Sequence, residues 1–246
     1  LSYKNLYTNA NSISEYLSLS KSEIPITSMP INYSFGLSII NSHLINGSTI
    51  LLTSKSVVQR EFWELFKKHK GTSLSGVPHT FETLLKLRFF RMNLPSLKTL
   101  TVAGGKLSKK KIVEYSKFCF EKKINFFVMY GQTEASPRMS YLPPNLLFDK
   151  SESIGISIPN GSFFLNDEQG KKVSNSNTVG ELVYEGDNVC LGYANDHKDL
   201  KKGDQNNNIL FTGDLAKRDI DGFYYIVGRK KRFVKLFGKR VNLDEI

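Results

Sequence analysis

Strand-like and helix-like segments alternate between residues 48 and 131, and this alternation limits the fold of the chain more than any other feature. Segments with apolar residues at helical spacing separate the strand candidates, which are residues 49–53, 73–77, 97–103 and 124–130. Such alternation is typical of a largely parallel sheet with helices on its faces. Ligands of these sheets bind at the carboxyl ends of strands. We therefore expect an α/β fold with a site near the turns at Gly104-Gly105 and Tyr130-Gly131.

The pattern changes after Pro143-Pro144. Strand candidates become short, helical periodicity ends, and turn signals such as Asn-Gly and Asp-Gly recur, which favours a small antiparallel barrel or sandwich. We expect three units along the chain. Residues 1–145 form part of a helix-flanked, mainly parallel sheet, residues 146–228 form a β-rich, barrel-like subdomain, and residues 229–246 form a hinge and the poorly packed start of a truncated domain.

Composition excludes several classes of protein. Hydrophobic residues make up 40% of the 246-residue chain, which is enough for a sizeable core. No run approaches the roughly 20 apolar residues of a membrane-spanning helix. The cysteines, Cys119 and Cys190, lie far apart without a nearby pair of histidines, so neither a disulfide framework nor a zinc site is expected. A cytoplasmic protein without a transmembrane segment fits these observations.

Basic residues give the chain a net charge of +11, concentrated in residues 106–123 and 217–240. The first cluster has the spacing of a solvated helix face. The second, with Phe233 and Phe237 interleaved, is also compatible with a nucleic-acid binder. The order of the enzyme motifs described next argues against that alternative, and we expect no nucleic-acid partner.

Residues 130–134 read Tyr-Gly-Gln-Thr-Glu at the end of a predicted buried strand. Glycine allows a ligand to approach the backbone, a threonine hydroxyl can donate to a phosphate oxygen, and a glutamate can hold magnesium. Taken alone, five residues are equally typical of a surface turn. The motif becomes informative when it is considered together with the other motifs of the chain.

Further motifs follow in a fixed order. They are Gly180-Glu181-Leu182-Val183, Gly192-Tyr193, Phe211-Thr212-Gly213-Asp214-Leu215, Asp221-Gly222-Phe223-Tyr224, residues 228–235 and Gly238-Lys239-Arg240-Val241. The set resembles the core motifs of the adenylate-forming superfamily, which includes acyl-CoA and aryl-CoA synthetases, luciferases and adenylation domains of peptide synthetases. Residues 30–36 and 103–107 fall where that superfamily has its acyl-pocket and glycine-rich motifs. The resemblance covers essentially the whole chain.

The resemblance implies a site for ATP or AMP. Tyr130 would stack on the adenine, with Gly104 and Gly105 lining the same slot. Asp214 would accept hydrogen bonds from both ribose hydroxyls, since a carboxylate offers two acceptor oxygens, and Arg229 would support the ribose. Asp214 alone would be equally typical of a turn. The complete set of implied cofactor-binding residues is Gly104, Gly105, Lys106, Tyr130, Gly131, Gln132, Thr133, Asp214 and Arg229.

The resemblance also implies catalytic roles. Thr133 would bind the α-phosphate, Glu134 would be the Mg²⁺ ligand, and Lys235 would serve the second half-reaction. Lys231 matches the hinge about which such enzymes swing a small domain. Without the resemblance, both lysines are typical of a solvated strand. The implied reaction joins a substrate carboxylate to the α-phosphate, releases pyrophosphate and passes the acyl group to a thiol, either coenzyme A or a carrier-protein phosphopantetheine.

The sequence indicates the chemical class of the substrate in part. Peptide-synthetase adenylation domains place an Asp after an aromatic residue to hold the substrate's α-amino group, whereas Gly36 follows Phe35 here. This favours a small-molecule carboxylic acid without an α-amine. Tyr33, Phe35, Gly36 and Val77 are the expected substrate residues. Phe81 would add to the apolar wall, although core packing explains it equally well.

Two family features are missing from the sequence. We find no Ser/Thr/Gly-rich loop ending in Pro-Lys-Gly, and residues 1–6 resemble the helix start that follows it. The small C-terminal domain would begin near Lys231, where the basic residues 230–232 depart from the acidic residue frequent beside the hinge. We therefore expect a nearly inert fragment of an AMP-forming acid–thiol ligase. The alternatives are a peptide-synthetase-like or carrier-loading adenylation domain, and a truncated, inactive relative.

Overall fold

A computed structural model describes residues 1–230, 233–236 and 239–242 of the chain. Its first sheet has the order β1-β2-β3-β4-β5, and its first three strands run parallel while β4 and β5 are antiparallel. The strands are β1 (Ser73–Gly76), β2 (Thr99–Val102), β3 (Asn125–Gly131), β4 (Arg138–Leu142) and β5 (Ile156–Ser157). Residues 49–53, expected to be a strand, contribute only an isolated parallel bridge between Leu51 and Ile26.

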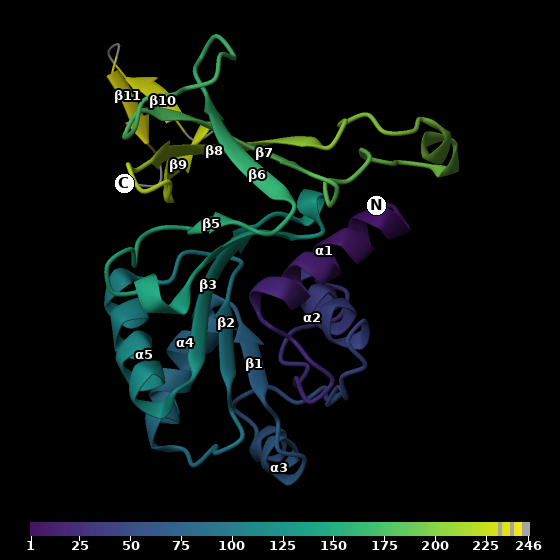
Figure 1. The fold of residues 1–246 in the computed structure, drawn as a ribbon, viewed down its shortest axis with the longest axis vertical. Helices are drawn as coiled ribbons and strands as arrows, with labels where there is room; N and C mark the ends of the chain where they lie inside the picture. The colour runs from purple at the N-terminus through teal and green to yellow at the C-terminus, as the bar shows by residue number, and fades with distance from the viewer. Residues whose placement is uncertain (231–232, 237–238, 243–246) are drawn as a thin grey trace.

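Helices cover both faces of this sheet, with α4 and α5 on one side and α1 and α2 on the other (Figure 1). Pro78 opens α4 at its first turn, where a missing backbone N–H costs nothing. The helices are α1 (Tyr3–Tyr16), α2 (Ser34–Leu44), α3 (Arg60–Lys68), α4 (Pro78–Lys86) and α5 (Lys109–Lys122), and the short 3₁₀ turns are η1 (Phe89–Arg91), η2 (Thr133–Ala135), η3 (Pro144–Leu146) and η4 (His197–Lys201).

Aromatic side chains fill the core between the sheet and helices α3, α4 and α5. Phe62, Phe66, Phe81 and Phe126 are each at most 1% exposed. A second core lies between the sheet and helices α1 and α2, and it contains Phe35 together with partly buried Val77. Both faces of the parallel strands are thus buried, as the apolar runs in the sequence predict.

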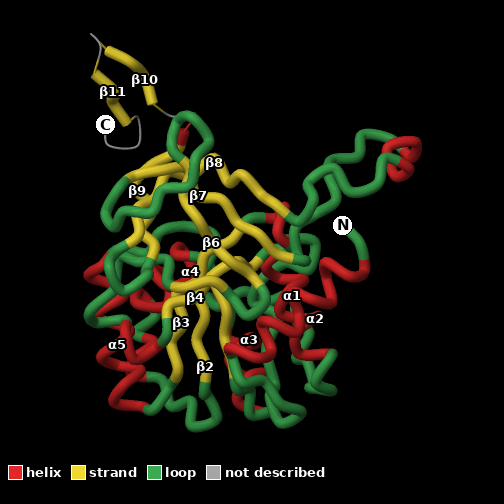
Figure 2. Tube along the Cα trace, turned by 45° about the horizontal axis from the view of Figure 1, so that its top comes forward, coloured by secondary structure: helices red, strands yellow, loops and turns green. Residues whose placement is uncertain are grey.

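A second, antiparallel sheet follows with the order β6-β7-β8-β9 (Figure 2). Its strands are β6 (Gly161–Asn166), β7 (Val179–Gly186), β8 (Ile209–Arg218) and β9 (Tyr224–Arg229), and β10 (Phe233–Leu236) pairs with β11 (Lys239–Asn242) in a separate hairpin. The predicted fold class is confirmed: a helix-flanked sheet containing parallel strands precedes a β-rich part.

The two main sheets are joined by specific contacts. Ala135 and Met139, which follow β3, are buried in the core of the second sheet. Gly155 bridges Tyr224, and the Ser153 hydroxyl donates to the Tyr224 carbonyl at 2.7 Å. β5 pairs with β4 although it lies beyond residue 145. The division into three units at residues 145 and 228 stays a prediction.

Helix α1 ties the beginning of the chain to both sheets. Ser2 and Asn5 cap the helix reciprocally. The Asn5 amide also donates to the carbonyls of Asp187 and Val189, and the Asn9 amide donates to that of Arg138. In the described residues we find no helix of the length and apolar character that crossing a membrane requires.

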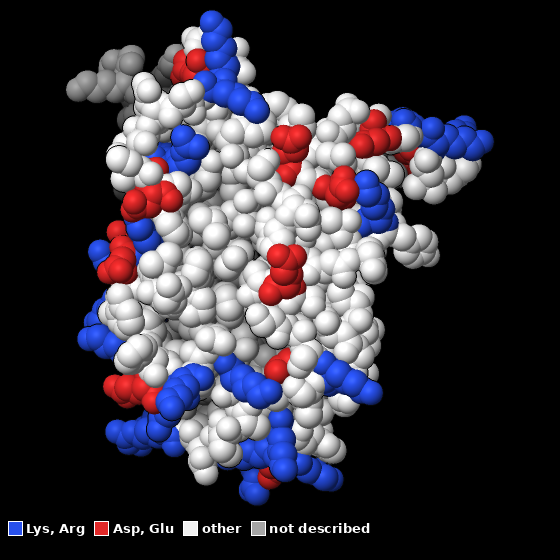
Figure 3. All heavy atoms as spheres, viewed as in Figure 1, with Lys and Arg blue, Asp and Glu red and all other residues white. Residues whose placement is uncertain are grey.

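Lysine and arginine side chains gather mainly toward one end of the face in Figure 3, with others on the loop between β7 and β8. In the cluster at residues 106–123, Lys109 pairs with Glu152 at 3.8 Å and Lys111 pairs with Glu82. These exposed or half-exposed ion pairs agree with the expected solvated helix face.

Candidate functional site

Asp214 is the centre of a hydrogen-bond network that joins the two sheets. Its carboxylate accepts from the Tyr130 hydroxyl at 2.6 Å, from the Gln132 amide at 3.3 Å and from Arg229 Nε at 2.9 Å. Tyr130 and Gln132 lie at the end of β3, whereas Asp214 and Arg229 face each other across β8 and β9. Residues 84 positions apart in sequence, Tyr130 and Asp214, therefore meet directly.

The Asp214 side chain is buried, and hydrogen bonds hold both its carboxylate and its backbone. Asp214 is 3% exposed, and a buried carboxylate is stable only with donors around it. The Thr212 hydroxyl accepts from the Asp214 N–H at 3.1 Å and donates to the Leu182 carbonyl at 2.7 Å. The Thr-Gly-Asp segment is thereby fixed from both sides.

The network keeps the Tyr130 phenol protonated. Burial raises the pKa of Tyr130, and the nearby negative charge of Asp214 raises this pKa further. The hydroxyl therefore remains a hydrogen-bond donor toward Asp214 at any physiological pH. The Tyr130 ring lies 6.4 Å from the Phe163 ring and packs against the core of the second sheet.

A ribose fits this carboxylate in part. A carboxylate oxygen accepts about two hydrogen bonds. Oδ2 of Asp214 already accepts two, from Tyr130 and Gln132, whereas Oδ1 accepts one, from Arg229. Oδ1 therefore has one acceptor position left for a ribose hydroxyl. The sequence-based expectation of bonds to both hydroxyls requires one present donor to move away.

A second group of expected residues meets at the carboxyl ends of β1 and β2. Gly104 has φ +79°, and a Cβ there would lie 2.7 Å from the Tyr33 hydroxyl and 3.2 Å from Val77 Cγ1. A Cβ on Gly105 would lie 3.2 Å from Pro78 Cγ. Tyr33 and Val77 therefore both lie next to Gly104, at the carboxyl ends of two neighbouring strands where ligands of such sheets bind.

Thr133 is exposed at the first position of η2, and its hydroxyl lies 3.0 Å from the Ser34 hydroxyl. Ser34 is the first residue of α2, directly after Tyr33. Ser34 was not among the expected site residues. Its place between Tyr33 and Phe35 in the acyl-pocket motif was the signal that could have revealed it.

Glu134 is held by the loop that follows β7. Its Oε1 accepts from the Tyr193 hydroxyl at 2.6 Å, and its backbone carbonyl accepts from the Cys190 N–H at 2.7 Å. The described residues contain no group of three or more His, Cys, Asp or Glu side chains that could hold a metal. Magnesium in nucleotide sites is bound by one or two carboxylates with substrate phosphates and water. A single Glu134 fits that donor set.

Phe35, Gly36 and Phe81 have packing roles in the structure. Phe35 is 2% exposed, and Phe81 is fully buried against Tyr115 and Phe126, which favours core packing for Phe81. A Cβ on Gly36 would lie 2.1 Å from the Pro30 carbonyl oxygen. No side chain fits at position 36, so an ammonium-binding aspartate is excluded there.

Three expected residues have no assigned contacts. Lys106 is exposed next to Gly105. Lys231 lies outside the described residues. Lys235 pairs with Arg240 in the β10–β11 hairpin, and its side chain lies outside the described part. The assignments of these three lysines stay predictions.

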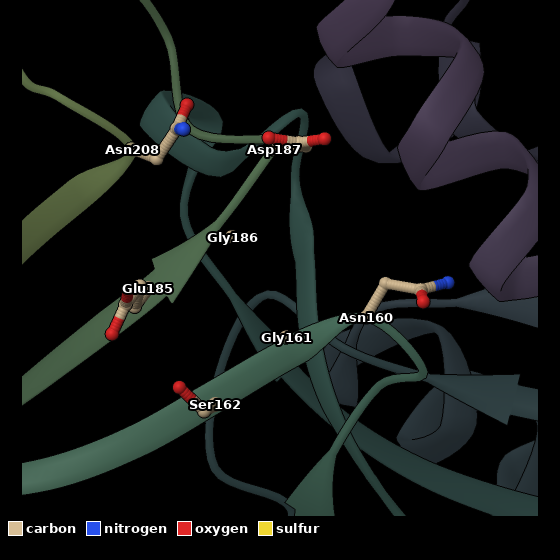
Figure 4. Close-up of a pocket in the computed structure, with 7 residues that line it drawn as sticks. All are labelled: Asn160, Gly161, Ser162, Glu185, Gly186, Asp187 and Asn208. Carbon is tan, nitrogen blue, oxygen red and sulfur yellow. The ribbon is translucent and has the colours of Figure 1, made fainter.

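A shallow polar pocket of about 360 Å³ lies apart from the expected residues, where β6 begins and β7 ends (Figure 4). None of its lining residues belongs to the predicted site. They are Asn160, Gly161, Ser162, Glu185, Gly186, Asp187 and Asn208.

Comparison with known proteins identifies the family. The sequence profile of AMP-binding enzymes matches residues 1–194. The chain belongs to this family. It is 29% identical to a probable 4-coumarate–CoA ligase 2 of Dictyostelium discoideum, with 100% of the chain and 45% of the relative aligned. It is also 29% identical to a 2-succinylbenzoate–CoA ligase of Bacillus cereus, with 98% of the chain and 48% of the relative aligned.

Solved structures of AMP-binding enzymes share the fold. The O-succinylbenzoate coenzyme A synthetase of Bacillus subtilis in complex with ATP and magnesium superposes with a TM-score of 0.83, over 98% of this chain and 49% of that protein, at 24% identity. A long-chain-fatty-acid–CoA ligase from Archaeoglobus fulgidus gives a TM-score of 0.78 at 23% identity, over 94% of this chain and 49% of that protein. The chain spans about half the length of the curated relatives it matches.

Proposed function

We propose that the full-length protein carrying this chain activates a carboxylic acid with ATP and passes the acyl group to a thiol, namely coenzyme A. Membership of the AMP-binding enzyme family and the acid–CoA ligase relatives support a reaction of this kind. The observation that carries the proposal is the network at Asp214. It presents a buried carboxylate, with one acceptor position left, at the end of β3.

The nucleotide would lie across these strand ends. Asp214 and Arg229 would bind the ribose, and Tyr130 with Gly104 would border the adenine. The Tyr130 hydroxyl donates to the Asp214 carboxylate and so holds it in place. The Gln132 amide donates to the same carboxylate oxygen and also to the Thr212 carbonyl at 3.0 Å. These groups are in place before a ligand binds, which lowers the entropic cost of positioning it.

At the reacting phosphate, the chain contributes few groups. The Thr133 hydroxyl would donate to a phosphate oxygen, and the carboxylate of Glu134 would hold Mg²⁺, with Tyr193 orienting that carboxylate. When bound, Mg²⁺ neutralises charge on the phosphates and so assists the attack of the substrate carboxylate. The hinge at Lys231 and the part of Lys235 in thiol transfer belong to the same proposal.

The acid would lack an α-amino group. The close approach of the Pro30 carbonyl to Gly36 leaves no space for a carboxylate where peptide-synthetase adenylation domains place one. This packing favours an acid–CoA ligase over an amino-acid-activating domain.

Pyrophosphate release tests the proposal directly. The full-length protein is incubated with ATP, Mg²⁺ and separate fatty, aryl and amino acids, first without and then with coenzyme A. We expect turnover with acids that lack an α-amine and formation of the acyl-CoA. Turnover restricted to amino acids, or acyl transfer only to a carrier protein, would support the alternative class instead. No release with any acid would refute the proposed activity.

A further inference from the structure

Arg138 is a buried cation without an anionic partner. It is 2% exposed and lies at the start of β4, opposite Gly131. Its Nε donates to the Ser38 hydroxyl at 3.1 Å, and its Nη1 donates to the Tyr16 hydroxyl at 3.1 Å and lies 3.5 Å from Met129 Sδ. All of these partners are neutral.

No acidic side chain within the described ranges forms an ion pair with Arg138, and no hydrogen bond there uses its Nη2. Burying an unpaired charge costs several kcal/mol, and arginine cannot lose its proton to avoid that cost. The positive charge of Arg138 contributes to lowering the pKa of buried His43. The two N–H groups of Nη2 remain available, and a guanidinium N–H forms a strong, charge-assisted hydrogen bond with a carboxylate.

The backbone of Arg138 is firmly fixed. Its carbonyl accepts from the Asn9 amide at 2.8 Å and from the Asn188 amide at 3.2 Å. The register of β3 and β4 shifts between Tyr130 and Gly131, opposite this residue, and such bulges near functional sites redirect side chains. The side chain is thereby directed between β3 and helices α1 and α2.

A chain of contacts connects Arg138 to the expected substrate residues. The guanidinium lies over the Phe35 ring, 5.1 Å from its centroid. The Phe35 ring meets the Tyr33 ring edge-on at 6.3 Å, and Tyr33 reaches the slot at Gly104. Tyr33 is 36% exposed, so this series of side chains runs from solvent to the buried cation.

We propose that Arg138 binds a second anionic group on the substrate, so that the acid activated at this site is a dicarboxylic acid. This inference rests on the proposed function. One carboxylate would lie at Thr133, beside Ser34, and the other at Nη2 of Arg138. The Phe35 ring, which separates the slot from the guanidinium, turns aside when the acid enters.

The helix that carries both serines sets the length of the acid. Ser34 and Ser38 are four residues apart on α2, and a helix rises about 1.5 Å per residue, so the two serines are separated by about 6 Å along the axis. An acid with two carboxylates separated by a few carbon atoms covers that distance. A long unbranched fatty acid has no group that would offset the buried charge.

Matched probes test the proposal in the full-length protein. ATP–pyrophosphate exchange is measured with dicarboxylic acids of about four to eight carbons and with the monomethyl ester of each, which keeps one carboxylate and removes the other charge. Removing one partner of a buried charge pair costs about 2 kcal/mol or more, which corresponds to about 30-fold. We therefore expect kcat/KM to be about 30-fold higher for the best diacid than for its ester.

The variant Arg138→Met, which keeps the apolar stem without the charge, should bring this ratio close to 1 while still activating the ester. Arg91→Met, at an exposed arginine, should leave the ratio unchanged. If Arg138→Met does not fold, the diacid and ester rates of the unchanged protein decide alone. Equal rates with diacid and ester, or better rates with fatty or aryl monoacids, overturn the role of Arg138 and leave the proposed function standing. Exchange with no acid at all overturns both.

Discussion

Asp214 and Arg229 face each other across strands β8 and β9, with Arg229 Nε 2.9 Å from Asp214 Oδ1. The arginine side chain is 58% exposed, whereas that of the aspartate is 4% exposed. Solvent screening makes the ion pair a weak contributor to stability. The arrangement instead places a buried acceptor beside a solvent-exposed cation, which favours a role in ligand binding over a role in stability.

The first prediction concerns the charge at that acceptor. Asp214→Asn removes the negative charge and places an amide donor against Tyr130 or Arg229. Charge-assisted hydrogen bonds contribute about 1.5–3 kcal/mol each, so we expect AMP affinity to fall at least about tenfold. Isothermal titration of the full-length protein with AMP measures this change. Asp149→Asn, at an exposed position, serves as the control. Unchanged affinity in a folded Asp214→Asn protein would remove Asp214 from the ribose site.

The second prediction concerns the support of Glu134. Tyr193 is 75% exposed, yet its hydroxyl donates to Glu134 Oε1 at 2.6 Å. Tyr193→Phe removes only this donor. Loss of a group that orients a metal ligand lowers metal affinity about 10- to 100-fold. Because Tyr193 is exposed to solvent, we expect an effect near the lower end of this range. We expect the Mg²⁺ concentration for half-maximal pyrophosphate release to rise about tenfold.

Tyr7→Phe is the matched control for Tyr193→Phe, because Tyr7 is 62% exposed on helix α1. It should leave the Mg²⁺ dependence unchanged. A Tyr193→Phe protein with the same Mg²⁺ dependence as the unchanged protein would show that the hydroxyl contact does not position the metal ligand.

Local sequence patterns predicted the framework of this chain because its elements follow simple periodicities. Pro78 marked the start of α4, and the apolar run at residues 124–130 corresponds closely to β3. The run at residues 49–53 has the composition of a strand, but only Leu51 forms a bridge. Strand formation there depends on a partner, which composition does not reveal.

Site residues that belong to sequence motifs could be predicted, whereas contacts that depend on tertiary packing could not. Tyr130, Asp214 and Arg229 were expected at one nucleotide, and Tyr130 and Arg229 each donate a hydrogen bond to Asp214. The contact of Ser34 with Thr133 and the burial of Arg138 depend on how α2 packs against β3 and β4. Ser34 could have been suspected from its place between Tyr33 and Phe35, whereas nothing in the sequence around Arg138 distinguishes it from an ordinary surface arginine.

The third prediction separates packing from specificity at Gly36. Because a Cβ would lie 2.1 Å from the Pro30 carbonyl oxygen, Gly36→Asp forces the backbone apart. Overpacking of this kind costs about 1–3 kcal/mol. We expect a clear loss of thermal stability and no gain of amino-acid activation. Leu37→Asp places the same charge on the next, 36% exposed residue of the helix and should cost much less. A stable Gly36→Asp protein that activates amino acids would contradict both the packing argument and the proposed acid class.

The last prediction is a pH dependence of stability that originates at His43. This residue is 3% exposed on α2, and its Nδ1 donates to the Ile39 carbonyl at 2.7 Å. In the described part of the chain its Nε2 has no hydrogen-bond partner. The pKa of His43 is lowered from 6.5 to about 4, mainly by burial and in part by the charge of Arg138, although the Ile39 bond and Glu23 act in the opposite direction.

The sign follows from which state takes up the proton first. His43 in the unfolded chain becomes charged as the pH falls through about 6.5, whereas the folded protein keeps it neutral until about pH 4. The folded state therefore has its full stability from this group above pH 6.5 and loses it between pH 6.5 and 4. Linkage gives a loss of about 2 kcal/mol between pH 8 and pH 5. Denaturant unfolding at the two pH values measures it in the unchanged protein, in His43→Gln and in the exposed-site control His69→Gln. Groups common to all three proteins cancel in the differences, so His43→Gln should lose about 2 kcal/mol less than the other two. An identical loss in all three proteins would place the origin of the pH dependence elsewhere.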